Sequence, residues 1–176
     1  MFGFFNYDGS STGLIVSIFL TGVTMLALAL GRQLWLATKG ILRSLPELKN
    51  ALRQLLEWGA DTGFVVIIPR GTKYFVQFKS YILRDGRRGM EMSFPKADWS
   101  KQFFGRLQQY CDANGVGYEI RIGENDPMSF LVVDCQTDID RAHDLIKAVV
   151  GEIFGLNVDR QYHVTFYDLA SKKQEL

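Results

Sequence analysis

The chain has 176 residues, of which 47% are hydrophobic, and its 20 Lys and Arg residues nearly balance its 19 Asp and Glu residues. This length fits one compact domain with an appendage and excludes a multidomain enzyme. A formal net charge of only +1 excludes the broad positive surface that non-specific binding to duplex nucleic acid requires.

The N-terminal part contains a long uncharged stretch. No charged residue lies between Gly9 and Gly31, and Gly13 to Leu30 reads GLIVSIFLTGVTMLALAL. As a helix this segment would be ~27 Å long, close to the ~30 Å hydrocarbon core of a bilayer. A cleaved signal peptide is the alternative, but residues 1–12 lack the basic n-region of a secretory signal. Residues 1–31 are therefore predicted to form an extracytoplasmic stub and a single transmembrane helix.

Basic residues follow this segment, whereas only Asp8 precedes it. Positive residues stay on the cytoplasmic side of a membrane, so the pattern predicts an inner (plasma) membrane protein with its N-terminus outside and its C-terminal domain in the cytoplasm. Small residues within the span favour close helix approach, and a homo-oligomer is expected. The basic residues are Arg32, Lys39, Arg43, Lys49 and Arg53.

Residues 32–44 are predicted to be a basic juxtamembrane connector. Ser44-Leu45-Pro46-Glu47 then has the S-x-x-E pattern of a helix N-terminus, where proline is tolerated in the first turn. A helix is predicted from near Leu45 to Gly59, packed on its own domain. A seven-residue recurrence of apolar residues from Leu34 to Leu55 leaves a coiled coil between subunits as the alternative.

Residues 45–169 are predicted to form the cytosolic domain, followed by a charged tail at residues 170–176. Beyond Gly63 the periodicity becomes that of strands, with turn residues at short intervals. A three-stranded meander is predicted first, then a helix capped by Asp98 and ended by Asn114-Gly115, then a hairpin. A helix capped by Thr137 or Asp138 and a last strand complete the domain. The predicted strands are Phe64 to Ile68, Tyr74 to Leu83, Met90 to Phe94, Tyr118 to Ile122, Phe130 to Val133 and Gln161 to Asp168.

The predicted fold class is α+β: a single N-terminal transmembrane helix, then an antiparallel sheet with helices on one face, in the order α-β-β-β-α-β-β-α-β. Over residues 45–154 this order resembles the type III secretion chaperone-like fold. The string KYFVQF, Lys73 to Phe78, is similar to an aromatic-valine-glutamine strand of that group. The resemblance implies that the domain holds a peptide against its sheet.

No pattern indicates catalysis, so a non-enzymatic protein without a cofactor is expected. The two histidines and two cysteines have no zinc-site spacing, and a metal site is not predicted. His143 is expected to be solvated, Cys111 and Cys135 to be buried and reduced, and Asp134, Asp138 and Asp140 to be an ordinary acidic surface. The phosphate-binding glycine motifs G-x-x-x-x-G-K-[ST] and G-x-G-x-x-G are absent from the sequence.

Two candidate ligand surfaces remain. The first is a basic hairpin tip that would meet an anionic ligand, formed by Arg84, Arg87 and Arg88. The second is the sheet face opposite the helices, where Gln77, Lys79 and Tyr81 alternate along one strand and form a platform for a peptide or a base.

The function expected from these features is a membrane-anchored cytosolic adaptor domain that binds a peptide or protein partner. The alternative is an oligomeric membrane effector of antiviral defence that senses a small anionic nucleotide. One short span with a small cytosolic domain is similar in plan to the cyclic-oligoadenylate-gated effectors of type III CRISPR defence. In both cases the partners include a lipid bilayer and exclude duplex nucleic acid.

Overall fold

The computed structural model describes residues 41–122 and 128–169, which belong to one compact unit that begins at Gly40. The helices in this part are α2 (Leu48–Trp58), α3 (Lys101–Ala113) and α4 (Ile139–Ala148), and α4 continues into the π-helical turn η1 (Val149–Ile153). The strands are β1 (Ile41–Arg43), β2 (Gly59–Pro69), β3 (Val76–Ile82), β4 (Arg88–Pro95), β5 (Glu119–Ile122), β6 (Ser129–Gln136) and β7 (Tyr162–Leu169).

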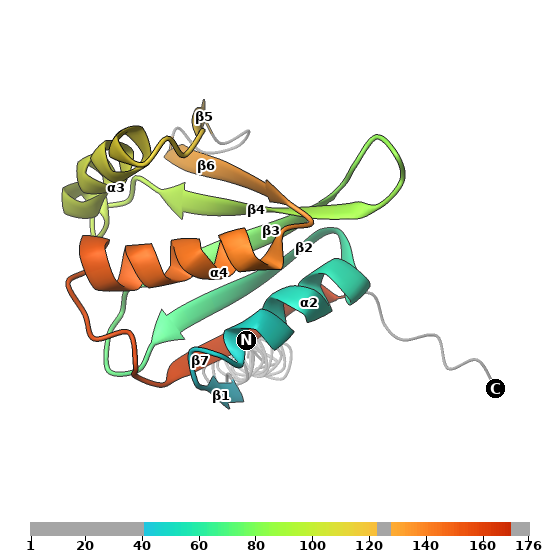
Figure 1. Cartoon of the computed structure of the whole chain (residues 1–176), viewed down its shortest axis with the longest axis horizontal. Helices are drawn as coiled ribbons and strands as arrows, with labels where there is room; N and C mark the ends of the chain where they lie inside the picture. The colour runs from blue at the N-terminus through green and yellow to red at the C-terminus, as the bar shows by residue number, and fades with distance from the viewer. Residues whose placement is uncertain (1–40, 123–127, 170–176) are drawn as a thin grey trace, which may run out of the picture. The chain divides into compact units, whose positions relative to one another are not determined.

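The strands form one antiparallel sheet in the order β1-β7-β2-β3-β4-β6-β5. The predicted meander β2-β3-β4 and the predicted hairpin β5-β6 are both present, because each needs only a short turn between neighbouring strands. Two pairings join segments that are distant in sequence: β6 lies beside β4, and β7 lies between β1 and β2 (Figure 1). The edges of the sheet are thus β1 and β5.

Helices α2 and α4 lie over the same face of the sheet (Figure 1). In α2 the buried residues Leu48, Ala51, Leu52 and Leu55 recur at helical spacing and form one apolar stripe. In β3 buried and partly exposed residues alternate, so each second side chain points to the helices. The buried residues of all three helices and of the central strands join one core. The opposite face of the sheet carries Gln77, Lys79 and Tyr81 of the candidate ligand residues.

Aromatic side chains close the end of the core near α3 and η1. Measured between ring centroids, Tyr74 lies 6.0 Å from Trp99, 5.2 Å from Phe154 and 5.0 Å from Phe103, and the contact with Phe103 is T-shaped. These large rings account for the close packing of α3 against η1, because aromatic side chains bury much surface and prefer tilted contacts.

The ends of the helices follow the predicted chemistry in most places. The Asp138 carboxylate accepts a hydrogen bond from the Arg141 N–H at 2.9 Å and caps α4, and Asn114 with Gly115, at φ +63°, ends α3. Glu47 accepts from the Ser44 N–H at 2.6 Å, the returning half of the predicted capping box, but Glu47 itself holds the cap position, so α2 begins at Leu48 and not near Leu45. Asp98 is not the cap of α3. It lies before Ser100, the residue at the cap position, and pairs with Lys101 at 2.6 Å.

The predicted fold class is corrected in its first element, the N-terminal transmembrane helix. It placed a transmembrane helix first, but none of the helices in residues 41–122 and 128–169 is long and apolar enough to cross a bilayer. The longest continuous helical run, α4 together with η1, spans residues 139–153, at most about 22 Å of helix against a core of about 30 Å. The predicted span lies outside the described residues. The domain also begins with a strand, since Ile41 to Arg43 pair with β7, a long-range contact that local periodicity does not reveal.

Candidate functional site

The open face of the sheet is where the predicted platform residues lie. Gln77, Lys79 and Tyr81 alternate with the buried Val76, Phe78 and Ser80 along β3, so all three point away from the helices. Lys79 lies opposite Glu91 of β4 and Phe64 of β2 in the strand register. The sequence prediction of a polar row on this face is therefore confirmed as a placement in the fold.

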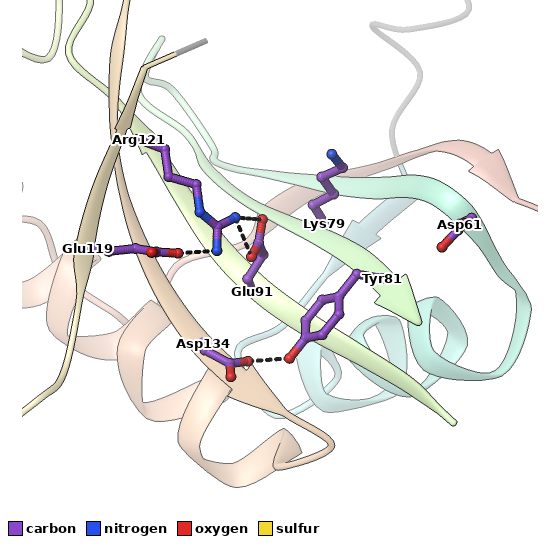
Figure 2. A pocket seen from close by; sticks show the side chains of 7 residues that line it. All are labelled: Asp61, Lys79, Tyr81, Glu91, Glu119, Arg121 and Asp134. Atoms are coloured by element: carbon purple, nitrogen blue, oxygen red, sulfur yellow. Dashed lines mark hydrogen bonds and ion pairs between the residues drawn. The ribbon is translucent and has the colours of Figure 1, made fainter. Parts of the chain in front are cut away.

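A buried carboxylate lies at the centre of this face. Glu91 of β4 is only 9% exposed, and both of its oxygens accept hydrogen bonds from Nη1 of Arg121 at 2.8 Å. Arg121 reaches across from the edge strand β5, and its other terminal nitrogen, Nη2, contacts Glu119 of the same strand (Figure 2). Burial disfavours the charge of Arg121, but its hydrogen bonds to the two carboxylates outweigh burial and raise the pKa of the guanidinium.

A second polar pair lies beside the first. The Tyr81 hydroxyl donates a 2.5 Å hydrogen bond to Oδ1 of Asp134, which also accepts from the Gln136 N–H at 2.9 Å (Figure 2). Burial first, and then the hydrogen bond to Asp134, raise the pKa of the Tyr81 hydroxyl above its ordinary value. Tyr81 therefore stays a hydrogen-bond donor through the neutral pH range.

An irregularity in β6 follows directly after Asp134. The register with β4 shifts by one residue, since Glu91 lies opposite Asp134 whereas Met90 lies opposite Gln136. Gln136 has φ 49°, in the left-handed region, at the end of this bulge. Bulges re-aim side chains at sheet edges and binding sites, and this one lets Asp134 serve both the backbone and Tyr81.

These side chains surround a hollow of about 380 Å³ on the open face. Four carboxylates line it, against one lysine and one arginine, so its charge balance is negative. Arg121 forms ion pairs with Glu91 and Glu119. Lys79 and Asp61 lie apart from the hydrogen-bonded side chains of the hollow (Figure 2). The lining residues are Asp61, Lys79, Tyr81, Glu91, Glu119, Arg121 and Asp134.

The three arginines of the predicted basic tip do not form one surface in the structure. Arg84 and Arg87 line a neighbouring hollow of about 440 Å³, which shares Tyr81 and Asp134 with the first. Arg87 is held by Asp85 at 2.7 Å within the turn, and this hydrogen bond lowers the pKa of the Asp85 carboxyl. Arg88 lies opposite Ile82 in the register and donates to the Glu57 carbonyl oxygen at the end of α2, on the helix side of the sheet.

The two predicted ligand surfaces thus adjoin at Tyr81, which lines both hollows, but two of the predicted residues line neither hollow. Lys79 and Tyr81 line the first hollow and Arg84 and Arg87 the second, whereas Gln77 and Arg88 are among the lining residues of neither. Sequence reasoning missed four lining residues and took Asp134 for an ordinary surface carboxylate; the four are Asp61, Glu91, Glu119 and Arg121. A signal was present for Glu91, which stands between two methionines in a predicted strand, where a charge requires a partner.

The remaining candidate residues have structural roles. His143 was expected to be solvated but is only 7% exposed, and its Nε2 lies 3.0 Å from the Leu45 carbonyl oxygen, so it ties α4 to the turn before α2. Cys111 and Cys135 are free and buried, as predicted, and burial raises their thiol pKa values to about 11 and about 12. Within the described residues no group of His, Cys, Asp and Glu side chains is arranged to hold a metal ion.

Comparisons with protein-family models, curated proteins and solved structures returned no match to this chain. The resemblance to the chaperone-like fold stays a prediction.

Proposed function

We propose that this domain is a non-enzymatic binding domain that holds a segment of a protein partner across the open face of its sheet, with a basic side chain of the partner in the hollow at Tyr81. The observation that carries this proposal is the hollow itself, in which polar side chains from β2, β3, β4, β5 and β6 converge with an excess of carboxylates.

The fixed positions of these side chains support binding. Tyr81 is held by Asp134, and Glu91 is held by Arg121, before any ligand arrives. Such preorganisation lowers the entropy cost of association, because the groups that meet the ligand are already fixed. An ammonium or guanidinium group in the hollow would gain charge-assisted hydrogen bonds to Asp61 and Asp134, two exposed carboxylates of its rim.

The same charges disfavour the alternative function, in which a small anionic nucleotide is sensed. The Arg87 charge is compensated within the turn by Asp85, and Arg88 is turned to the helix side. A phosphate at the tip would also lie near Asp134, which lines both hollows. The inner-membrane location concerns residues outside the described part of the chain and stays a prediction.

The proposal is tested with extended synthetic peptides that differ at one central position, occupied by Arg, Lys, Ala or Glu. Binding to the purified 176-residue chain is measured by fluorescence anisotropy. We expect the Arg and Lys peptides to bind about tenfold more tightly than the Glu peptide, since one charge-assisted hydrogen bond contributes roughly 1.5–3 kcal/mol. Asp134→Asn and Asp61→Asn should each remove most of this preference.

Asp112→Asn, an exposed aspartate on α3, is the matched control and should leave the preference unchanged. Equal affinity for the Arg and Glu peptides would contradict the proposal. So would tight binding of a nucleotide that is lost when Arg84 and Arg87 are replaced by Ala, because that result would assign the tip, and not the hollow, as the binding site.

A further inference from the structure

The edge strand β5 presents an exposed surface for strand pairing. It is the last strand in the sheet order, its one pairing among residues 41–122 and 128–169 is with β6, and all four of its residues are exposed. Two of them are isoleucines on the helix side of the sheet, Ile120 and Ile122, with 45% and 72% of their surface exposed. The outer backbone N–H and C=O groups of such a strand form a ready template for another strand.

The sequence of β5 is complementary to itself in one antiparallel register. Around a two-fold axis at Ile120, Glu119 faces Arg121 of a second copy, and Ile120 faces Ile120 of that copy. Opposite charges and β-branched side chains in facing positions stabilise an antiparallel pair. An axis at Arg121 would instead place two arginines face to face, which is unfavourable. The sequence of β5 therefore favours the register around Ile120. In this register the facing side chains of the two copies lie on the same face of the joined sheet.

We propose that two copies of the chain associate through antiparallel pairing of their β5 strands around a two-fold axis at Ile120. Symmetric two-fold contacts are the commonest form of homo-oligomer. The paired segment is short and buries less than a standard interface of about 1,600 Å², so a dissociation constant on the order of micromolar is expected. The occupant of this edge is thus a second copy of this chain.

The pairing also changes the hollow. Glu119 and Arg121 line it, so the second copy brings its own Arg121 to the rim beside Glu119. Facing side chains in such a pair have Cβ atoms about 5 Å apart. The two hollows then lie on the same face of a continuous sheet, one on each side of the axis, and a partner with two basic segments fits both. This consequence rests on the proposed function, whereas the dimer rests on β5 alone.

The register is tested by cysteine crosslinking of the 176-residue chain at about 100 μM, well above the expected dissociation constant. Facing cysteines on paired strands approach the Cβ separation of a disulfide, about 3.8 Å. Ile120→Cys should therefore give a disulfide-linked dimer on a non-reducing gel. Ile82→Cys is the matched control, an isoleucine of β3 with 46% exposure. The native cysteines are buried, so they do not compete.

Equal dimer yields from Ile120→Cys and Ile82→Cys would overturn the inference. A second pair of variants uses light scattering to measure mass: Ile120→Lys places two positive charges at the axis and should give monomer where the unmodified chain and Ile82→Lys give dimer. A monomeric unmodified chain, or a dimer unaffected by Ile120→Lys, would also overturn it. Peptide affinity is measured separately, so that a crosslinked dimer without peptide binding rejects only the proposed function.

Discussion

The buried Glu91 carboxylate determines much of the chemistry of the open face. It stands in β4 between the fully buried Met90 and Met92, and it reaches Arg121 across the sheet. A buried charge loses its hydration, and its ion pair contributes little net stability, but removal of one partner leaves the other charge uncompensated. The pair therefore acts as a unit in which each residue requires the other.

Replacing Arg121 with Met should lower the free energy of unfolding by about 2 kcal/mol, because Glu91 then keeps a buried, unpaired charge. This figure is below the cost for a fully buried pair, since the Arg121 side chain is 47% exposed. Urea denaturation measures the change. Adding Glu91→Gln should recover a large part of the loss, because the neutral amide needs no counterion.

Lys101→Met is the control for this prediction. Lys101 also forms an ion pair, with Asp98, but both side chains are mostly exposed, so the change should leave stability almost unchanged. Equal effects of Arg121→Met and Lys101→Met would show that Glu91 is not the source of the loss.

At the scale of elements, α4 is anchored at its N-terminus by contacts with α2 and by its own cap. Lys49 of α2 pairs with Asp140 at 2.6 Å, and the Asp138 carboxylate accepts from the Arg141 N–H. The cap satisfies one of the backbone N–H groups that the first turn of a helix leaves without a partner. The apolar residues of α4 then meet the sheet beside α2.

Asp138→Ala should destabilise the domain by about 1 kcal/mol, the usual cost of losing an N-cap side chain. A lower midpoint in thermal unfolding, followed by circular dichroism, is the expected readout. Asp138→Asn should keep most of the stability, because its side-chain oxygen still accepts the Arg141 N–H. If Asp138→Ala and Asp138→Asn unfold at the same temperature as the unmodified chain, the cap does not stabilise α4.

At the scale of the whole molecule, the helices and the inner strands β2, β3, β4, β6 and β7 share one core inside the compact unit that begins at Gly40. The edge strand β1 belongs to this unit, since Ile41, Leu42 and Arg43 pair with β7. A boundary placed before β1 thus keeps the sheet whole, whereas a boundary at Leu45 removes one of its strands.

A fragment of residues 40–176 should fold by itself, because its core residues come from within that range. We expect mixed helix and strand signal in circular dichroism and a single cooperative unfolding transition in urea. A fragment that starts at Leu45 should unfold at a lower urea concentration, since β7 then loses its pairing with β1. Absence of a cooperative transition in the longer fragment would contradict a self-contained fold.

The sequence by itself determined the local elements of this protein. The alternation from Val76 to Ile82, the turn around Gly86 and the cap at Asp138 depend on neighbouring residues only, so periodicity and turn chemistry predicted them. The same alternation placed Lys79 and Tyr81 on the open face, because side chains in a strand point to opposite faces in turn.

Only the tertiary structure decided which strands meet and which charges pair. The positions of β1, β6 and β7 in the sheet depend on pairing between distant segments, for which local periodicity carries no signal. Glu91 and Arg121 are 30 residues apart in sequence, and their contact exists only because β6 and β5 continue the sheet beyond β4. The negative charge balance of the hollow, on which the proposed preference for a basic partner rests, follows from that long-range order and not from the basic tip that the sequence displays.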